Sequence, residues 1–473
     1  MITAPGIGSG LDVEGIITQL MSIERRPLTA LDAKETAFNT QLSDYGTLKS
    51  DLSSFQTEAK KIKDTTAFNA YTATPADPTI FTSSPSTSSI PGNYSISVTQ
   101  LAAAQKIVAT GQTASNTAIG TGASTTLTID FGTIGGGTFN ATTGKYTGAT
   151  FTLNPSKTTK TVTIGSTDNT LEGIRDAINA VDIGVKASIV NDGSALPFRL
   201  VLTPSDGGVS NSLRIGVAGD ATLQTLLAQD PAGTQNMMQT VTAQDALLTV
   251  DGLSMTKTSN TITDVIQGTT LNLTKTGSTS LSILRDNDAI TKDITKMVDA
   301  FNQFRERIKS LRLSSLNGDN TLLSIESQMT SIFSTPASGL TGQFSYLAEV
   351  GISFQKDGTL AIDSSILKNK LDTNYQDVVE LFTHVDQGFA YRLEQTAKDI
   401  LKFDGVIENK TDGLNQRIKD LTTDRDRLER RMIGIEDRLR AQFTALDGLL
   451  SSLQTTSNFL TQQLDNLPTI GKN

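Results

Sequence analysis

The C-terminal part of the chain carries a long run of apolar residues spaced three or four apart. The run extends from Leu414 to Leu467, and its steps alternate between four and three except across Ile435, Leu439 and Phe443. Such a repeat predicts a helix that pairs in a left-handed coiled coil, and the repeated step of four predicts a stutter where the supercoil unwinds. At 1.5 Å per residue this helix would be roughly 80 Å long. No compact domain needs such a helix, so the sequence predicts a stalk.

Two other segments have the same helical spacing and are candidate partners. Apolar residues from Leu31 to Ile62 recur mostly three or four apart, and a third run extends from Ile290 to Leu311. We expect these helices to pair antiparallel or to form a bundle, although a monomeric bundle that uses every stripe internally remains open. The predicted seam consists of Leu42, Leu52, Ile294, Phe301, Ile308, Leu421, Leu428, Met432, Ile435 and Leu439.

The two extremities of the helical flanks are predicted to serve assembly. A short apolar stripe precedes the N-terminal helix, with Asp12 as its N-cap and Pro27 as the break. Both extremities extend beyond most of the obvious partners, so we expect them to be loose in the monomer and to order against neighbouring subunits. The predicted subunit or filament interface contains Leu11, Val13, Ile16, Ile17, Leu20, Ile23, Leu460, Leu464 and Leu467.

Between the flanks the sequence changes in kind. Charged residues become sparse, and Ser, Thr and Gly alternate with apolar residues as in half-exposed antiparallel strands. Hairpins are predicted at Asn191 to Gly193 and at Asp251 with Gly252, and the strands near Tyr94 and Leu248 are predicted to share a sheet. A further hairpin is expected around Asp357 and Gly358.

The expected fold is therefore α+β: a long helical coiled-coil stalk formed by both flanks, with a β-rich, two-part head inserted between them. The predicted divisions are an N-terminal helical leg over 1–70, a first head part over 71–115, an inserted outer head domain over 116–239, a second head part over 240–285, and a C-terminal helical stalk with a small β-hairpin over 286–473.

Composition excludes most enzymatic chemistry. The chain has no Cys, no Trp and a single His, His384, so thiolate sites and His-based triads are excluded. No residues at metal-ligand spacing surround His384, and we interpret it as structural. No catalytic, cofactor-binding or metal-binding residues are predicted. The net charge of −9 argues against a nucleic-acid partner. The N-terminal sequence lacks the pattern of a cleaved signal peptide, so secretion would need another route.

Several stretches resemble the flagellar hook-associated protein 2 family, the bacterial filament caps. These are GIGSGLDVEGIITQLMSIERRPL near the start, GNYSISVTQLAAAQKI, DALLTVDGLSMTKTSNTITDVIQGTTLNLTKT, LAEVGISFQKDGTLAID and the closing SNFLTQQLDNL. The region TLEGIRDAINAVDIGVKASIVNDGSALPFRLVLT resembles an insert motif of flagellins and caps. The resemblance extends over nearly the whole chain.

This resemblance implies a homo-oligomeric ring at the tip of the growing filament, beneath which flagellin subunits insert. It also implies export through the flagellar type III pathway, a cytoplasmic chaperone on the C-terminal helices, contact with hook-filament junction proteins and, in some members, host mucin. Three alternatives are weighed against it: another hook-associated protein or flagellin-like subunit, a coiled-coil surface adhesin, and a two-carboxylate glycosidase, which a chain without Trp supports poorly.

Overall fold

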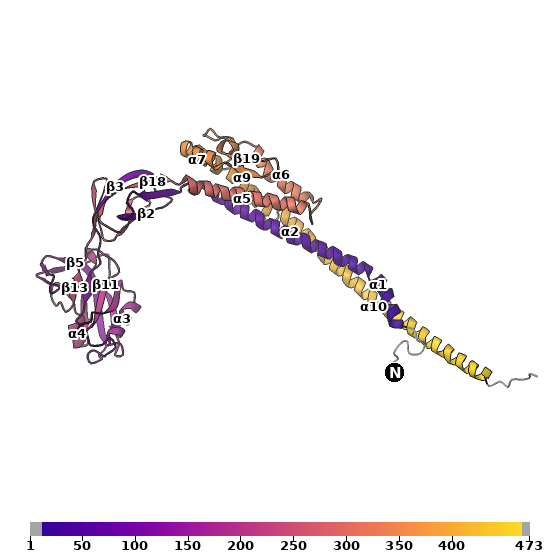
Figure 1. The fold of residues 1–473 in the computed structure, drawn as a ribbon, viewed down its shortest axis with the longest axis horizontal. Helices are drawn as coiled ribbons and strands as arrows, with labels where there is room; N and C mark the ends of the chain where they lie inside the picture. The colour runs from indigo at the N-terminus through magenta and orange to yellow at the C-terminus, as the bar shows by residue number, and fades with distance from the viewer. Residues whose placement is uncertain (1–11, 466–473) are drawn as a thin grey trace, which may run out of the picture. The chain divides into compact units, whose positions relative to one another are not determined.

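The structure is a computed structural model that describes residues 12–465. It divides the chain into two compact units: Met1–Phe68 with Asn287–Asn473, and Asn69–Asp286. The first unit is dominated by helices and the second by strands (Figure 1). The prediction that helical flanks enclose a β-rich middle is therefore confirmed.

The N-terminal flank forms two consecutive helices, α1 over Val13–Glu24 and α2 over Arg26–Ile62. The carboxylate of Asp12 accepts a hydrogen bond of 2.8 Å from the backbone N–H of Gly15, so Asp12 is the predicted N-cap. Pro27 lies in the first turn of α2, where its missing N–H is not needed and where it marks the break from α1.

The C-terminal flank forms one helix, α10, over the 60 residues Val406–Asp465, which makes it roughly 90 Å long. It lies beside α1 and α2 (Figure 1). Ion pairs join Lys49 to Glu408 at 2.7 Å, Glu35 to Arg425 at 3.2 Å and Arg25 to Glu436 at 3.3 Å. The residue numbers fall along α2 as they rise along α10, so the two helices run antiparallel.

The third predicted helix is α5, Asn287–Arg312, and its apolar face is buried. The Phe301 ring lies 5.6 Å from that of Phe55 on α2 and 5.0 Å from that of Phe333, between ring centroids. The remaining elements of this unit are η1 (Thr65–Phe68), α6 (Asn320–Ser334), η3 (Leu347–Val350), the predicted hairpin of β19 (Ile352–Phe354) with β20 (Leu360–Ile362), α7 (Ser364–Thr373), α8 (Tyr375–Thr383) and α9 (Phe389–Leu401).

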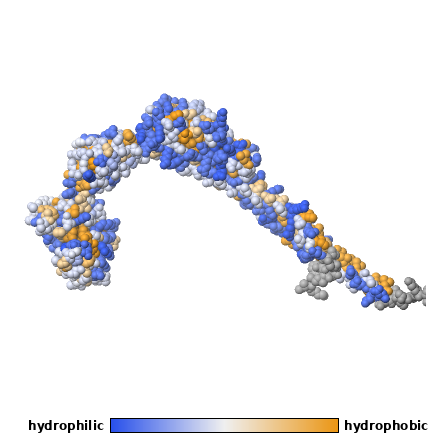
Figure 2. All heavy atoms as spheres, in the orientation of Figure 1, coloured by the Kyte–Doolittle hydropathy of each residue, from blue (hydrophilic) through white to orange (hydrophobic). Residues whose placement is uncertain are grey.

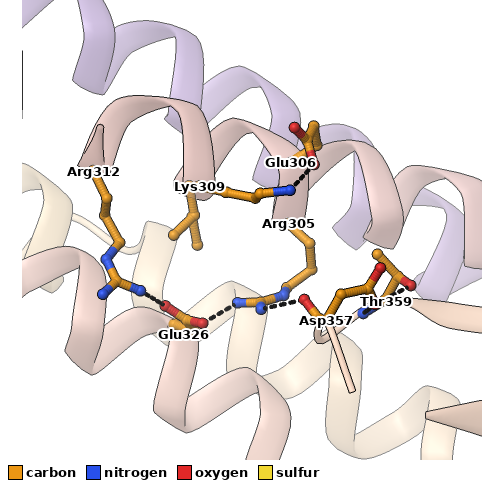
Figure 3. A pocket seen from close by; sticks show the side chains of 8 residues that line it. Arg305, Glu306, Lys309, Arg312, Glu326, Asp357 and Thr359 are labelled. Atoms are coloured by element: carbon orange, nitrogen blue, oxygen red, sulfur yellow. Dashed lines mark hydrogen bonds and ion pairs between the residues drawn. The ribbon is translucent and has the colours of Figure 1, made fainter. Parts of the chain in front are cut away.

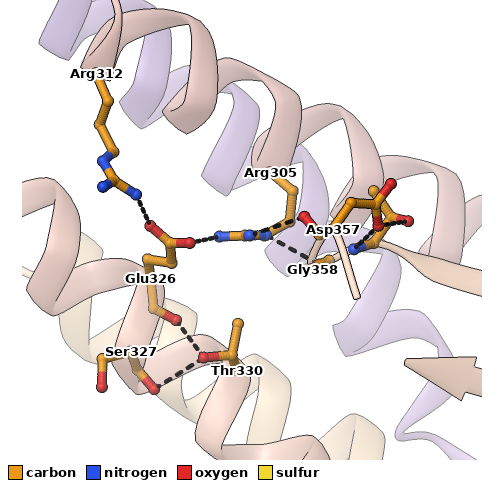
Figure 4. Close-up of polar contacts among 8 residues, drawn as sticks. Arg305, Arg312, Glu326, Ser327, Thr330, Asp357 and Gly358 are labelled. Carbon is orange, nitrogen blue, oxygen red and sulfur yellow. Dashed lines mark hydrogen bonds and ion pairs between the residues drawn. The ribbon is translucent and has the colours of Figure 1, made fainter. Parts of the chain in front are cut away.

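A buried arginine ties the hairpin to the helices. Arg305 on α5 donates through Nε to the carbonyl of Gly358 at 3.0 Å, and its Nη1 lies 2.7 Å from Glu326 on α6. Glu326 also pairs with Arg312 at 2.8 Å, so one carboxylate serves two guanidinium groups (Figure 4). The groups line a small polar pocket into which Lys309 and Glu306 also extend (Figure 3). Because Arg305 is buried and its cationic group is paired, this cluster orients α5, α6 and the hairpin tip.

We expect Gly358→Ala to destabilise the helical unit by about 2 kcal/mol or more, because Gly358 has a φ of +85° and a Cβ there would meet the Arg305 guanidinium. Urea denaturation of the purified protein measures the change. Gly413→Ala is the matched control: Gly413 lies within α10, nothing lies near its Cβ position, and a gain of about 1 kcal/mol is expected. Equal stability of the two variants would contradict the proposed anchoring.

The β-rich unit contains two apolar cores. The first lies against a five-stranded sheet in the order β1-β18-β3-β14-β15 and a three-stranded sheet in the order β16-β17-β2. Leu248 pairs with Val98, so the strands near Tyr94 and Leu248 do share a sheet. The strands are β1 (Tyr71–Pro75), β2 (Phe81–Pro85), β3 (Gly92–Gln100), β14 (Ala246–Val250), β15 (Leu253–Lys257), β16 (Thr261–Ile266), β17 (Thr269–Leu273) and β18 (Gly277–Arg285).

The second core is built from the sequence between β3 and β14, where one sheet has the order β10-β11-β4-β13 and another the order β12-β5-β8, with β9 also paired to β5. The short strand β4 precedes residue 116, yet Ile107 and Ala109 belong to this core. The elements are β4 (Lys106–Val108), β5 (Thr125–Gly135), β6 (Thr138–Asn140), β7 (Lys145–Thr147), β8 (Thr150–Leu153), β9 (Lys160–Ile164), α3 (Leu171–Ala180), β10 (Val185–Asn191), β11 (Phe198–Pro204), η2 (Val209–Asn211), β12 (Ser212–Ala218), α4 (Ala221–Leu227) and β13 (Met238–Val241).

Candidate assembly interface

The part of α10 from Met432 to Phe443 is covered on one face by α1. Val13, Ile17 and Met21 are each at most 3% exposed, and they pack with Met432. These three residues are spaced four apart, so they share one face of α1. Leu28, Ile435, Leu439 and Phe443 complete the cluster as partly buried neighbours.

This packing corrects the expectation that the whole N-terminal extremity is loose in the monomer. Val13 and Ile17 are buried within their own chain, because the apolar stripe of α10 continues through Met432 to Phe443 and provides a surface for α1. The other predicted residues of α1 have no such cover: Leu20 and Ile23 are exposed and Ile16 is half-buried. Leu11 lies outside the described residues.

Charged side chains flank the contact between α1 and α10. Arg440 pairs with Glu14, and Arg25 pairs with Glu436 at 3.3 Å. These groups are largely exposed, so solvent screens both pairs and they contribute little to stability. Their main effect is to favour one orientation of α1 along α10.

The C-terminal third of α10 presents an apolar stripe that no described residue covers. Leu453, Leu460 and Leu464 are 56%, 55% and 65% exposed. Leu446 and Leu449 extend the same stripe toward the covered part of the helix, and Figure 2 shows apolar spheres along this end of the molecule. Leu467 lies outside the described residues. A helix face of this kind is typical of a surface that binds another chain. We call the five leucines 446, 449, 453, 460 and 464 the distal stripe.

The predicted seam residues fall into two groups within the helical unit. Leu52, Ile294, Phe301, Ile308 and Met432 are buried, whereas Leu42, Leu421, Leu428, Ile435 and Leu439 are half-buried. The buried residues of α2 and α5 pack within the multi-helix bundle, whereas Ile435 and Leu439 border the contact of α10 with α1. Sequence reasoning missed the bundle helices α6 and α9, although Leu322, Ile325, Met329 and Ile332 of α6 show helical spacing.

Features that would indicate chemistry or membrane insertion are not found in residues 12–465. No group of three His, Asp or Glu side chains there could hold a metal ion, and no helix there is both long and apolar enough to cross a bilayer. His384 caps α8 at its C-terminal end, and its Nδ1 lies 2.6 Å from the carbonyl oxygen of Val385. The exposed distal stripe is the candidate site that the described residues offer.

Comparison with known proteins covers nearly the whole chain. Residues 9–105 match the family model described as the N-terminus of flagellar hook-associated protein 2, and residues 243–455 match its C-terminus. The flagellar hook-associated protein 2 of Escherichia coli K12 is 33% identical, with 98% of each chain covered, and that of Salmonella typhimurium is 32% identical with the same coverage. The crystal structure of the D1, D2 and D3 domains of the Escherichia coli flagellar cap protein has a TM-score of 0.66 and 33% identity, and covers 79% of this chain and 99% of that chain.

Proposed function

The chain belongs to the flagellar hook-associated protein 2 family, and from this premise we propose that it forms the structural cap at the tip of the growing bacterial flagellar filament. There it promotes the insertion and polymerisation of flagellin and prevents the loss of flagellin to the medium. Its action is that of an assembly protein and not of an enzyme. The alternatives of a flagellin-like subunit or an adhesin are not favoured, because the matched family covers both flanks of the chain.

The observation that carries this proposal is the distal stripe. Burial of leucine side chains away from water is favourable by about 25 cal/mol for each Å² of apolar surface. A secreted chain that exposes five of them along one helix face gains stability by burying them against another chain. The antiparallel pairing with α1 and α2 holds the first part of α10 in place, and within residues 12–465 Leu453, Leu460 and Leu464 at its end are left exposed for such a contact.

We propose that the distal stripe, together with Leu20 and Ile23 on α1, contacts neighbouring subunits of a homo-oligomeric ring or the flagellin and junction proteins of the filament. Leu11 and Leu467 are expected to continue the same surfaces. Val13, Ile16 and Ile17 contribute differently, since they hold or border the contact of α1 with α10.

Before export the same stripe would be exposed in the cytoplasm. We propose that a flagellar export chaperone covers it there, and that the chain leaves by the flagellar type III pathway. This assignment rests on the family and on the exposure of Leu460 and Leu464. From the family resemblance alone we also propose host mucin as a partner, and binding of purified mucin to the isolated protein would test this.

A strain that lacks the gene tests the function directly. We expect such a strain to swim poorly and to release flagellin monomers into the medium, and expression of this chain to restore both properties. An adhesin would leave swimming unchanged and would alter attachment instead. Normal filaments in the null strain would contradict the cap assignment.

Removal of residues 460–473 is expected to leave both units folded, because Leu460 and Leu464 make no buried contact within the described chain. The same truncation should weaken oligomer formation and chaperone capture. Native mass spectrometry and circular dichroism, run on the same preparations, measure both properties. Unchanged oligomer mass together with unchanged chaperone binding would contradict the proposed role of this end.

A further inference from the structure

The loop between α5 and α6 contains the only Asn-Gly pair in the sequence, Asn317 and Gly318. Asn317 is exposed, and Gly318 has a φ of +77° with open space where a Cβ would lie. Glycine leaves the backbone nitrogen that follows an asparagine accessible, because it carries no side chain to obstruct approach.

Neither reacting group is held by a hydrogen bond. Within residues 12–465, the Asn317 side-chain amide has no hydrogen-bonding partner and the Gly318 N–H donates to no acceptor. Other turns in the chain differ. In the Asn191 to Gly193 turn, the Asn191 side-chain oxygen accepts from the Gly193 N–H at 3.0 Å, and Asp357 is held by the N–H and hydroxyl of Thr359.

We propose that Asn317 is a site of spontaneous deamidation. The deprotonated backbone nitrogen of Gly318 attacks Cγ of Asn317, a C–N bond forms, and the side-chain nitrogen leaves as ammonia. Water then hydrolyses either carbonyl of the resulting succinimide, which yields aspartate or isoaspartate at position 317. The net reaction consumes one water, releases one ammonia and adds one carboxylate.

The position of this loop gives the reaction a structural consequence. Two residues further on, the Asp319 carboxylate accepts a hydrogen bond of 2.7 Å from the Tyr45 hydroxyl on α2 and lies 2.9 Å from Nζ of Lys410 on α10. It also caps α6 through the backbone N–H of Thr321. Burial opposes the ionisation of Asp319, but the hydrogen bonds from Lys410, Tyr45 and Thr321 outweigh it and lower its pKa to about 2.

Asp319 is therefore one point at which α2, α6 and α10 are joined. Residues 316–319 form a tight turn, in which the Asp319 N–H donates a hydrogen bond of 3.1 Å to the carbonyl of the buried Leu316. An isoaspartate at 317 adds a methylene to the backbone of this loop and displaces Asp319 from its partners. The ageing of one exposed residue would thus loosen the helical unit.

The test compares the full chain with Asn317→Gln after incubation at mildly alkaline pH, which favours the deprotonated nitrogen. Peptide mapping by mass spectrometry locates the product, and Asn320, which is also exposed but precedes Thr321, is an internal reference. We expect conversion at Asn317 well before Asn320, and a lowered melting temperature in aged wild type but not in aged Asn317→Gln. Asn317→Ser serves as a second blocked variant.

Two results would overturn the proposal. If Asn317 stays intact, or converts no faster than Asn320, the loop does not favour the reaction. If Asn317 converts while the aged wild type melts at the same temperature as the blocked variants, the modification does not weaken the contacts of Asp319.

Discussion

A double substitution of Leu453→Asp and Leu460→Asp in the distal stripe is expected to abolish capping while leaving the folded chain intact. Both leucines are more than half exposed, so the change in folding free energy should stay within about 0.5 kcal/mol. In an assembled interface, however, each aspartate would carry a charge into apolar surroundings, and an unpaired buried charge costs several kcal/mol. The measurements are thermal melting of the purified chain, swimming of the complemented null strain, and flagellin in its medium.

The matched control places the same two charges on the opposite face of the same helix, as Thr455→Asp and Gln462→Asp. These positions lie about half a turn around α10 from the distal stripe and are exposed. We expect this variant to swim normally. If both double variants lose capping equally, added charge and not the apolar face is responsible. If both swim normally, the distal stripe is not an assembly surface.

The long helix and its pairing could be predicted because periodicity alone carries the information. The heptad steps from Leu414 to Leu464 define one face of α10, and the buried residues of α5 follow the steps of its own repeat. Periodicity does not reveal how far along α10 a partner helix extends. For that reason the burial of Val13 and Ile17 against Met432 was not anticipated, although their spacing already placed them on one face.

Other features depend on contacts that no sequence pattern announces. Arg305 is a charged residue within a helical repeat, and it is buried because the Gly358 carbonyl and Glu326 come from elements distant in the sequence. The strand β4 has three residues and too little alternation to be recognised, yet it lies between β11 and β13. The distal stripe shows a third limit: the sequence predicts that its face is apolar, but only the structure shows that residues 12–465 leave it exposed.

Phe301→Ala should produce the largest loss of stability among single substitutions in the helical unit. Phe301 is fully buried on α5, and its ring contacts Phe55 on α2 and Phe333 on α6, so truncation leaves a cavity where three helices meet. Replacement of a buried Phe by Ala costs about 3–5 kcal/mol, because lost transfer free energy and cavity formation add. Urea denaturation followed by circular dichroism at helical wavelengths measures the change.

Phe403→Ala removes the same atoms from a side chain that is 90% exposed, between α9 and α10, and is the control for this measurement. We expect its stability to stay within about 0.5 kcal/mol of wild type. If Phe301→Ala cost no more than Phe403→Ala, the contact of α2, α5 and α6 would not be the core of this unit. A large loss confined to Phe301→Ala would instead show that the contact of α2, α5 and α6 holds the helical bundle together.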